Sequence, residues 1–212
     1  DSVMTKNAAQ TFTTRTGNCL SLAIMTAAFA KEIGISVQFQ SVVGEYTWSR
    51  SGDLYVSAGH VNLILGKRDI ASRFGYSSDQ GLTIDFLAPE DGGNHRTYVI
   101  EEETILAMYM NNRAAEMLMQ GKLDEAYWYA REAIKQDANF IPSYNTLGVI
   151  YQRHGNMLEA QQILSFAYQF ARDNTVIMSN LMLALKNMGR IDEANTMAAA
   201  LQRIQPYPPF YY

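Results

Sequence analysis

The chain has 212 residues, of which 48% are apolar, so it is long enough for one large or two small domains with buried cores. Because its formal net charge is −4 and its sequence pI is about 5.4, it lacks the basic field expected of a nucleic-acid-binding protein. A single cysteine excludes an internal disulfide and a thiolate metal cage, and no apolar run reaches the roughly 18 residues that a membrane-spanning helix needs.

The sequence opens on Asp1, without an initiator methionine or a signal pattern, and we interpret it as part of a longer protein. An export signal or a lipid anchor would then lie in an upstream segment. The cellular compartment stays open on the sequence alone.

The first predicted element is a buried helix over residues 20–33. Its apolar residues recur at helical spacing, and Gly34 closes it. The preceding pair, Gly-Asn at 17–18, fits a turn followed by a helix cap. Cys19, the only cysteine, is therefore expected in the first turn of the helix.

Strands are predicted after this helix, which makes the first half an α+β domain with an antiparallel sheet. The strands cover residues 35–43, 54–65 and 81–87, and residues 97–103 are expected to lead into the second half. His60 lies on the second strand. Asp85 lies on the third, where a carboxylate among apolar neighbours is costly unless it is paired or hydrogen-bonded.

The second half repeats a short motif, GKLDEA, GNMLEA and GRIDEA, at a constant spacing of 34 residues. This period is typical of tetratricopeptide repeats (TPR), in which each repeat is a pair of antiparallel helices. The resemblance to the TPR family implies an all-α solenoid of three helical hairpins, near residues 107–140, 141–174 and 175–208. The glycines that open the motifs, Gly121, Gly155 and Gly189, are expected to end the first helix of each pair in a left-handed conformation. We therefore divide the chain into domains 1–104 and 105–212.

A TPR array implies a protein or peptide partner bound on its concave face. Asn112, Asn145 and Asn180 on the first helices are the candidate contacts. Arrays that hold a terminal carboxylate combine such asparagines with lysines. Because matching lysines are missing here, we do not expect carboxylate capture.

Cys19, His60 and Asp85 together suggest nucleophilic catalysis. A nucleophilic cysteine needs its thiolate near neutral pH, whereas a free thiol has a pKa of roughly 8.5, so it requires a positive environment and a histidine base. His95 falls in a polar loop and His154 at the solvated end of a repeat helix, which leaves His60 as the candidate base. Asp85 would accept a hydrogen bond from the imidazole and fix its tautomer.

GNC at a helix start, followed by a strand, GHVNL and IDFLAPE, resembles the transglutaminase-like fold of the papain-type superfamily. The resemblance covers about 10–88, and together with the repeats the chain is similar to a bacterial group of transglutaminase-like proteins. It implies Cys19 as nucleophile, His60 as general base and then acid, and Asp85 as the residue that orients His60. Many members carry a tryptophan soon after the histidine, where this chain has Val-Asn.

The group that stabilises the oxyanion is not specified by a motif. Gln10 and a main-chain amide at Cys19 are the candidates. Asn18, Trp48 and Asn62 lie on stretches expected to border the cleft, although Trp48 is also suited to packing.

Two functions are compatible with these patterns. In the first, the chain is a cysteine enzyme that forms a thioester with an amide substrate, without cofactor or metal. Water would make it a peptidase or amidase and an amine would make it a transamidase, with the repeats recruiting the protein substrate. In the second, the chain is a non-catalytic adaptor, in which Cys19 is a small apolar residue and His60 a satisfied core histidine. Metal binding by His60 and Asp85 lacks sufficient ligands.

Overall fold

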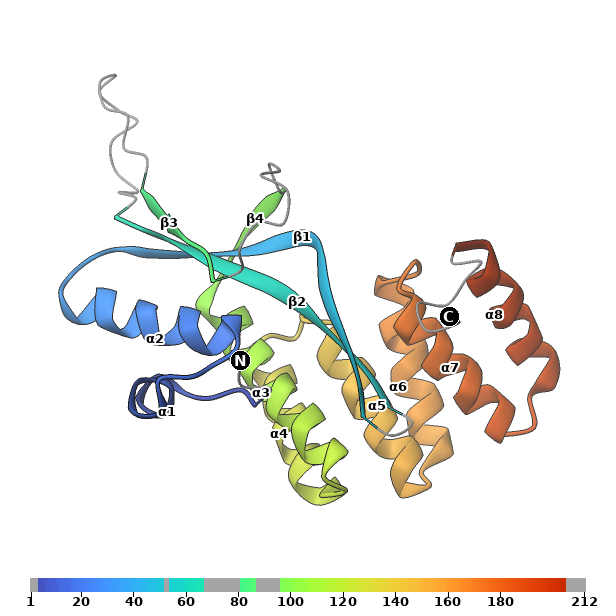
Figure 1. Cartoon of the computed structure of the whole chain (residues 1–212). Coiled ribbons are helices and arrows are strands. Elements are labelled where there is room, and N and C mark those ends of the chain that lie inside the picture. Colours follow the sequence, from blue (N-terminus) through green and yellow to red (C-terminus); the bar gives the residue numbers. More distant parts are fainter. Residues whose placement is uncertain (1–3, 52–53, 67–80, 87–95, 205–212) are drawn as a thin grey trace. The chain divides into compact units, whose positions relative to one another are not determined.

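The computed structural model describes residues 4–51, 54–66, 81–86 and 96–204. The chain divides into two compact units, unit 1 (Asp1–Ile105) and unit 2 (Leu106–Tyr212). The domains predicted from the sequence were 1–104 and 105–212. Unit 1 contains all the strands that the structure describes, and helical hairpins make up unit 2 (Figure 1).

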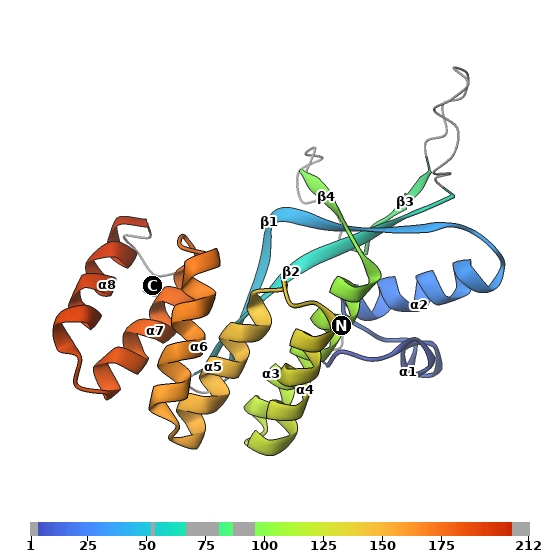
Figure 2. The ribbon, with the colours of Figure 1, turned by 180° about the vertical axis from the view of Figure 1, so that it is seen from behind.

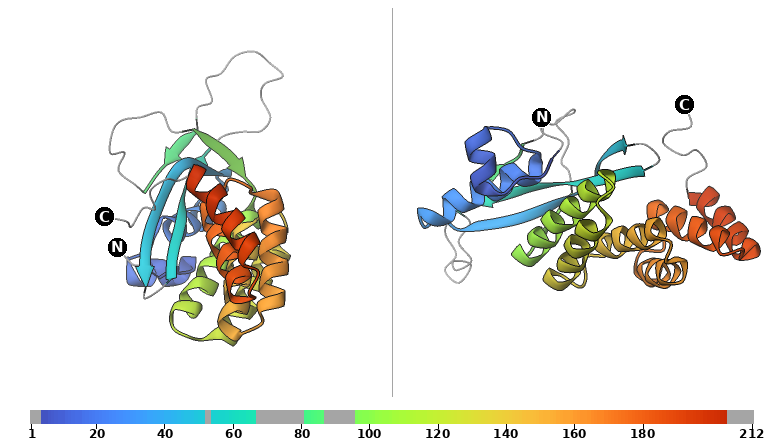
Figure 3. Two further views of the ribbon diagram at one scale, coloured as in Figure 1. Left: turned by 90° about the vertical axis from the view of Figure 1, so that its right-hand side faces the viewer. Right: turned by 90° about the horizontal axis from the view of Figure 1, so that it is seen from below.

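In its described residues, unit 1 combines two helices with a four-stranded antiparallel sheet. The helices are α1 (Ala8–Thr14) and α2 (Cys19–Glu32), and the strands are β1 (Val37–Ser51), β2 (Leu54–Leu65), β3 (Leu82–Ile84) and β4 (Thr97–Ile100). The strand order is β3-β2-β1-β4. The two helices lie on the same side of the sheet (Figures 1 and 3), and small buried residues of α2 let it pack closely against β2.

The sheet differs from the sequence expectation in three places. β1 was predicted to end at residue 43 but continues to Ser51, because its hairpin with β2 resumes at Tyr46 after a break in register that follows Val42. β4 was expected only as a lead into the repeats, yet it pairs with β1. Among the described residues, β3 covers only Leu82–Ile84, so Asp85 follows the strand instead of lying within it.

Strand register determines which side chains share a face. One apolar row crosses the sheet with a residue from each strand: Ile84, Leu63, Phe39 and Ile100. Because successive side chains alternate between faces, His60 and Asn62 lie on the face opposite this row. Both are buried, so this face carries polar groups inside unit 1.

The described part of unit 2 forms three consecutive helical hairpins, which lie side by side in chain order (Figures 1 and 2). The pairs are α3 (Glu102–Met119) with α4 (Leu123–Gln136), α5 (Pro142–His154) with α6 (Met157–Phe170), and α7 (Thr175–Asn187) with α8 (Ile191–Ile204). These positions confirm the predicted TPR-like helical part, although α3 begins earlier than expected. In the part of the chain that the structure describes, every helix is too short or too polar to cross a membrane.

Small residues control the geometry of the hairpins. Gly121, Gly155 and Gly189 have positive φ values of 74°, 93° and 75°, as predicted for the residues that end the first helices. Gly148, inside α5, allows close helix packing instead of a turn. A Cβ atom there would lie 2.5 Å from Cγ of the fully buried Leu164 on α6, so the two helices approach too closely for any side chain.

This contact predicts that Gly148→Ala destabilises unit 2 by about 1–3 kcal/mol through overpacking. A loss of stability would point to overpacking, because alanine is otherwise about 1 kcal/mol more favourable than glycine inside a helix and would stabilise it. Urea unfolding followed by circular dichroism would measure the change. In a Leu164→Ala background the same substitution should become neutral or stabilising, and equal stability of Gly148→Ala and wild type would contradict the packing argument.

Candidate functional site

Cys19 is the first residue of α2, and the cap of this helix fixes its position. Asn18 precedes it with extended backbone angles and accepts through Oδ1 from the Ser21 backbone N–H at 2.9 Å and from the Ser21 hydroxyl at 2.7 Å. Asn18 Nδ2 donates to Thr5 Oγ1 at 2.9 Å. The half-buried, free thiol of Cys19 is thereby held at the positive end of the helix dipole.

His60 and Asp85 form a short hydrogen bond. The His60 side chain is 4% exposed and that of Asp85 is 35% exposed. His60 Nε2 lies 2.6 Å from Asp85 Oδ1, and because a carboxylate accepts, the imidazole N–H is the donor. This bond leaves Nδ1 as the ring nitrogen that is free to act on another group.

Asn62 engages the second oxygen of the same carboxylate. Its Nδ2 donates to Asp85 Oδ2 at 3.1 Å. The β2–β3 register explains the contact, since Leu63 pairs with Ile84 and one further step places Asp85 opposite Asn62. Asp85 is thus held between two side chains of one strand.

The pKa of His60 reflects both of its neighbours. Burial lowers this pKa, but hydrogen bonding with Cys19 and with Asp85, together with electrostatic interaction with both groups, outweighs burial and raises it above the ordinary value. The thiol is therefore near the ring, although Nδ1 meets no partner with regular hydrogen-bond geometry among the described residues. The structure thus brings Cys19, His60 and Asp85 together from α2, from β2 and from the end of β3.

The remaining cleft candidates have other roles in the structure. Gln10 Oε1 accepts from the backbone N–H of Asn7 at 3.2 Å and completes the capping box of α1. Asn18 is committed to the cap of α2. The sequence predicted the cap at Asn18 in addition to its place beside the cleft, whereas the capping role of Gln10 was not predicted. The backbone of Trp48 pairs with Ser57, and the Trp48 side chain lies outside the described residues.

Two buried residues that support the cysteine were missed in the sequence. Ser21 and Thr5 are 0% and 2% exposed, and both hold Asn18. The Asn-x-x-Ser spacing at 18–21 is a capping signal that could have identified Ser21. Thr5 lies 13 positions before Asn18, and only the tertiary structure reveals this contact.

Of the other two histidines, the structure describes His154. His154 is exposed in unit 2 and its Nδ1 lies 2.5 Å from Asn156 Oδ1, and His95 lies outside the described residues. Over the described ranges, no group of three or more histidine, cysteine, aspartate or glutamate side chains is arranged to hold a metal ion.

The candidate partner-binding asparagines lie on the first helices of successive hairpins. Asn180 Nδ2 on α7 donates to Asn145 Oδ1 on α5 at 2.9 Å. Gln152 Nε2 donates to the Asn180 carbonyl at 2.8 Å, which strengthens this link between the two helices. Asn112 lies half-buried on α3.

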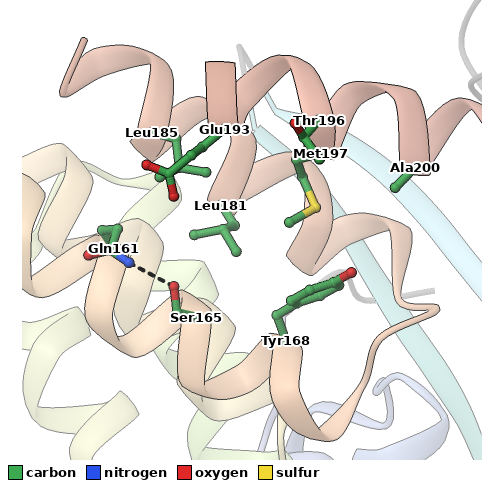
Figure 4. A pocket seen from close by; sticks show the side chains of 9 residues that line it. All are labelled: Gln161, Ser165, Tyr168, Leu181, Leu185, Glu193, Thr196, Met197 and Ala200. Carbon is green, nitrogen blue, oxygen red and sulfur yellow. Dashed lines mark hydrogen bonds between the residues drawn. The ribbon is translucent and has the colours of Figure 1, made fainter. Parts of the chain in front are cut away.

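Unit 2 also contains a groove of about 280 Å³ between α6, α7 and α8 (Figure 4). It is lined by Gln161, Ser165, Tyr168, Leu181, Leu185, Glu193, Thr196, Met197 and Ala200. Its polar side chains are engaged nearby: Gln161 donates to Ser165 at 2.8 Å, and Glu193 accepts from Arg190 at 2.6 Å. The groove brings together no nucleophile and base, so we treat it as a feature of helix packing.

Comparisons with known proteins concern the repeats. No family model matches the chain, and no curated protein matches its sequence. Similar solved structures include the first TPR of Spaghetti (RPAP3) bound to HSP90 peptide SRMEEVD, at 18% identity and a TM-score of 0.48 over 50% of this chain and 86% of that one. The Arabidopsis OM64 TPR domain has 15% identity and a TM-score of 0.48 over 50% of this chain and 88% of that one.

A third structure, the first TPR domain of human RPAP3, has 18% identity and a TM-score of 0.47 over 49% of this chain and 82% of that one. None of these three is a transglutaminase-like protein. Similarity at this level carries no conclusion about binding or activity. Unit 2 is a TPR-like array on the strength of its own 34-residue period and its paired helices.

The raised pKa of His60 predicts a pH dependence of stability in unit 1. A group whose pKa is higher in the folded state stabilises the fold below its unfolded pKa, about 6.5 for histidine, and this contribution is lost as pH rises through the folded pKa. Asp85→Asn should lower the NMR titration midpoint of the His60 ring and flatten the pH dependence of hydrogen-exchange protection in β2. Asp137→Asn in unit 2 is the control and should leave both unchanged. A midpoint unaffected by Asp85→Asn would refute the coupling.

Proposed function

We propose that unit 2 is a protein-interaction module that binds a peptide segment of a partner along its first helices, α3, α5 and α7. Hairpin arrays of this kind present one extended face built from equivalent positions of successive repeats. The observation that carries the proposal is the bond between Asn145 and Asn180, because it sets polar side chains of two adjacent repeats side by side. Amide side chains both donate and accept, which suits them to a peptide backbone.

Peptide selection tests this function. Random peptides displayed on phage would be selected against the whole chain, and the affinity of a selected peptide measured by fluorescence anisotropy. We expect Asn145→Leu and Asn180→Leu each to weaken binding about tenfold, which corresponds to about 1.4 kcal/mol. The control is Gln202→Leu on the exposed face of α8, which should bind normally. Selected peptides that bind all variants equally would place the interaction elsewhere.

We also propose that unit 1 carries a cysteine acyl-transfer site of the transglutaminase-like type, with Cys19, His60 and Asp85 in the roles of nucleophile, base and orienting residue. The 2.6 Å contact between His60 and Asp85 is the observation that favours it, since it orients a buried imidazole that also interacts with the thiol. No comparison contributes to this second function, which rests on the geometry of the site alone.

In the proposed reaction, His60 Nδ1 takes the thiol proton as Cys19 sulfur attacks an amide carbonyl. The C–N bond then breaks, the leaving amine receives the proton from His60, and a thioester remains on Cys19. The backbone N–H of Cys19 is among the first N–H groups of α2, which have no intrahelical acceptor, and we assign it to the developing oxyanion.

The second half of the reaction determines the product. His60 removes a proton from water or from an amine, which attacks the thioester and returns the thiol. Water gives a peptidase or amidase, and an amine gives a transamidase. Peptide binding by unit 2 would supply affinity for a protein substrate.

Alkylation of Cys19 tests the nucleophile directly, because the chain has no other cysteine. We expect iodoacetamide to label wild type at about pH 6.5 roughly tenfold faster than His60→Ala, since the imidazole no longer assists loss of the thiol proton. His154→Ala should label like wild type. Incubation with glutamine peptides and a fluorescent primary amine would then separate amine incorporation from hydrolysis.

Equal labelling of wild type and His60→Ala would refute the catalytic proposal. The chain would then be an adaptor, in which unit 1 is a degenerate enzyme fold and unit 2 alone provides the function.

A further inference from the structure

Asn62 is a buried polar residue beside the candidate site. It is 5% exposed and lies two positions after His60 on the same face of β2. A side-chain amide at such a position loses its hydration and needs hydrogen-bond partners in the protein to compensate.

The two ends of the Asn62 amide differ in their hydrogen bonding. Its Nδ2 donates to Asp85 Oδ2 at 3.1 Å, whereas its Oδ1 is buried without a hydrogen-bond partner among the residues that the structure describes. An amide held by one bond, with its carbonyl unsatisfied, contributes less to folding than an apolar residue of similar size would. Stability alone therefore does not account for an asparagine here.

The bond that Asn62 does make acts on the carboxylate that orients His60. With Oδ2 engaged by Asn62 and Oδ1 engaged by His60, rotation of the Asp85 carboxyl group would break both contacts. A donor also stabilises the ionised form of the carboxylate, which is the form that accepts from the imidazole N–H. Because Asp85 lies beyond the end of β3, the strand ladder does not itself hold this side chain.

We propose that Asn62 is a positioning residue, which holds Asp85 in the ionised form and in the rotamer that keeps the Nε2–H tautomer of His60 and leaves Nδ1 available to the Cys19 thiol. This role rests on the proposed acyl-transfer function of unit 1. It differs from the cleft or oxyanion role expected from the sequence, since the amide nitrogen of Asn62 is directed at Asp85. Asn62 acts through Asp85 and does not touch the reacting atoms.

The test compares Asn62→Leu and Asn62→Ser with wild type in the whole chain. We expect labelling of Cys19 by iodoacetamide at about pH 6.5 to slow roughly three- to tenfold, as half to one pKa unit of weakened coupling to His60 would produce. The unfolding midpoint of Asn62→Leu should be equal to or higher than that of wild type. Asn195→Leu in unit 2, the same substitution at an exposed asparagine of α8, should leave labelling unchanged.

Nitrogen NMR of the His60 ring measures the populations of its two tautomers. A substitution of Asn62 that affected only stability would leave these populations unchanged. Wild type should show mainly the Nε2–H tautomer, and both Asn62 variants should show an increased share of the Nδ1–H form. Because two substitutions of different size are used, the result does not depend on the folding of one variant.

The outcomes separate this inference from the function on which it rests. Suppose that His60→Ala slows the labelling of Cys19, whereas both Asn62 variants keep the labelling rate and the tautomer populations of wild type. This result would overturn the positioning role and leave the acyl-transfer proposal intact. Equal labelling of wild type and His60→Ala would overturn both.

Discussion

The hydrogen bond between His60 and Asp85 is the constraint on which the arrangement of unit 1 depends. It joins residues 25 positions apart, and an imidazole buried on β2 would be costly without it. A shift of one residue in the β2–β3 register would move the polar side chains to the opposite face, so the pair fixes the register. The start of α2 lies at this point as well, because the Cys19 thiol is near the same ring.

Unit 2 is governed by a different constraint, the close approach of paired helices. Gly148 against Leu164 shows how little space separates α5 from α6, and the turn glycines let each hairpin reverse within a few residues. The contact between Asn145 and Asn180 then links one repeat to the next. The two proposed functions reflect these different constraints. Unit 1 assembles one site from segments far apart in the sequence, whereas unit 2 presents equivalent positions of successive hairpins on one surface.

Much of the site could be predicted from the sequence because its residue types are chemically informative. A cysteine at a helix start, a histidine on a strand and an acid predicted within an apolar strand indicated three partners, and the structure brings them together. Their catalytic roles stay predictions. The second partner of Asp85 could not be predicted, because Asn62 acquires it only through the strand register. Gln10 was predicted to lie in the cleft, whereas in the structure it completes the capping box of α1.

The sequence by itself determined the helical hairpins of unit 2 and the start of α2, because these depend on contacts between residues close in the chain and on local capping chemistry. Only the tertiary structure decided the length of β1, the pairing of β4 and the position of Asp85 after β3. Periodicity shows which face a side chain occupies, but not which residue lies opposite it. That choice requires strands far apart in sequence to pair, and their register is set by the packing of the whole sheet.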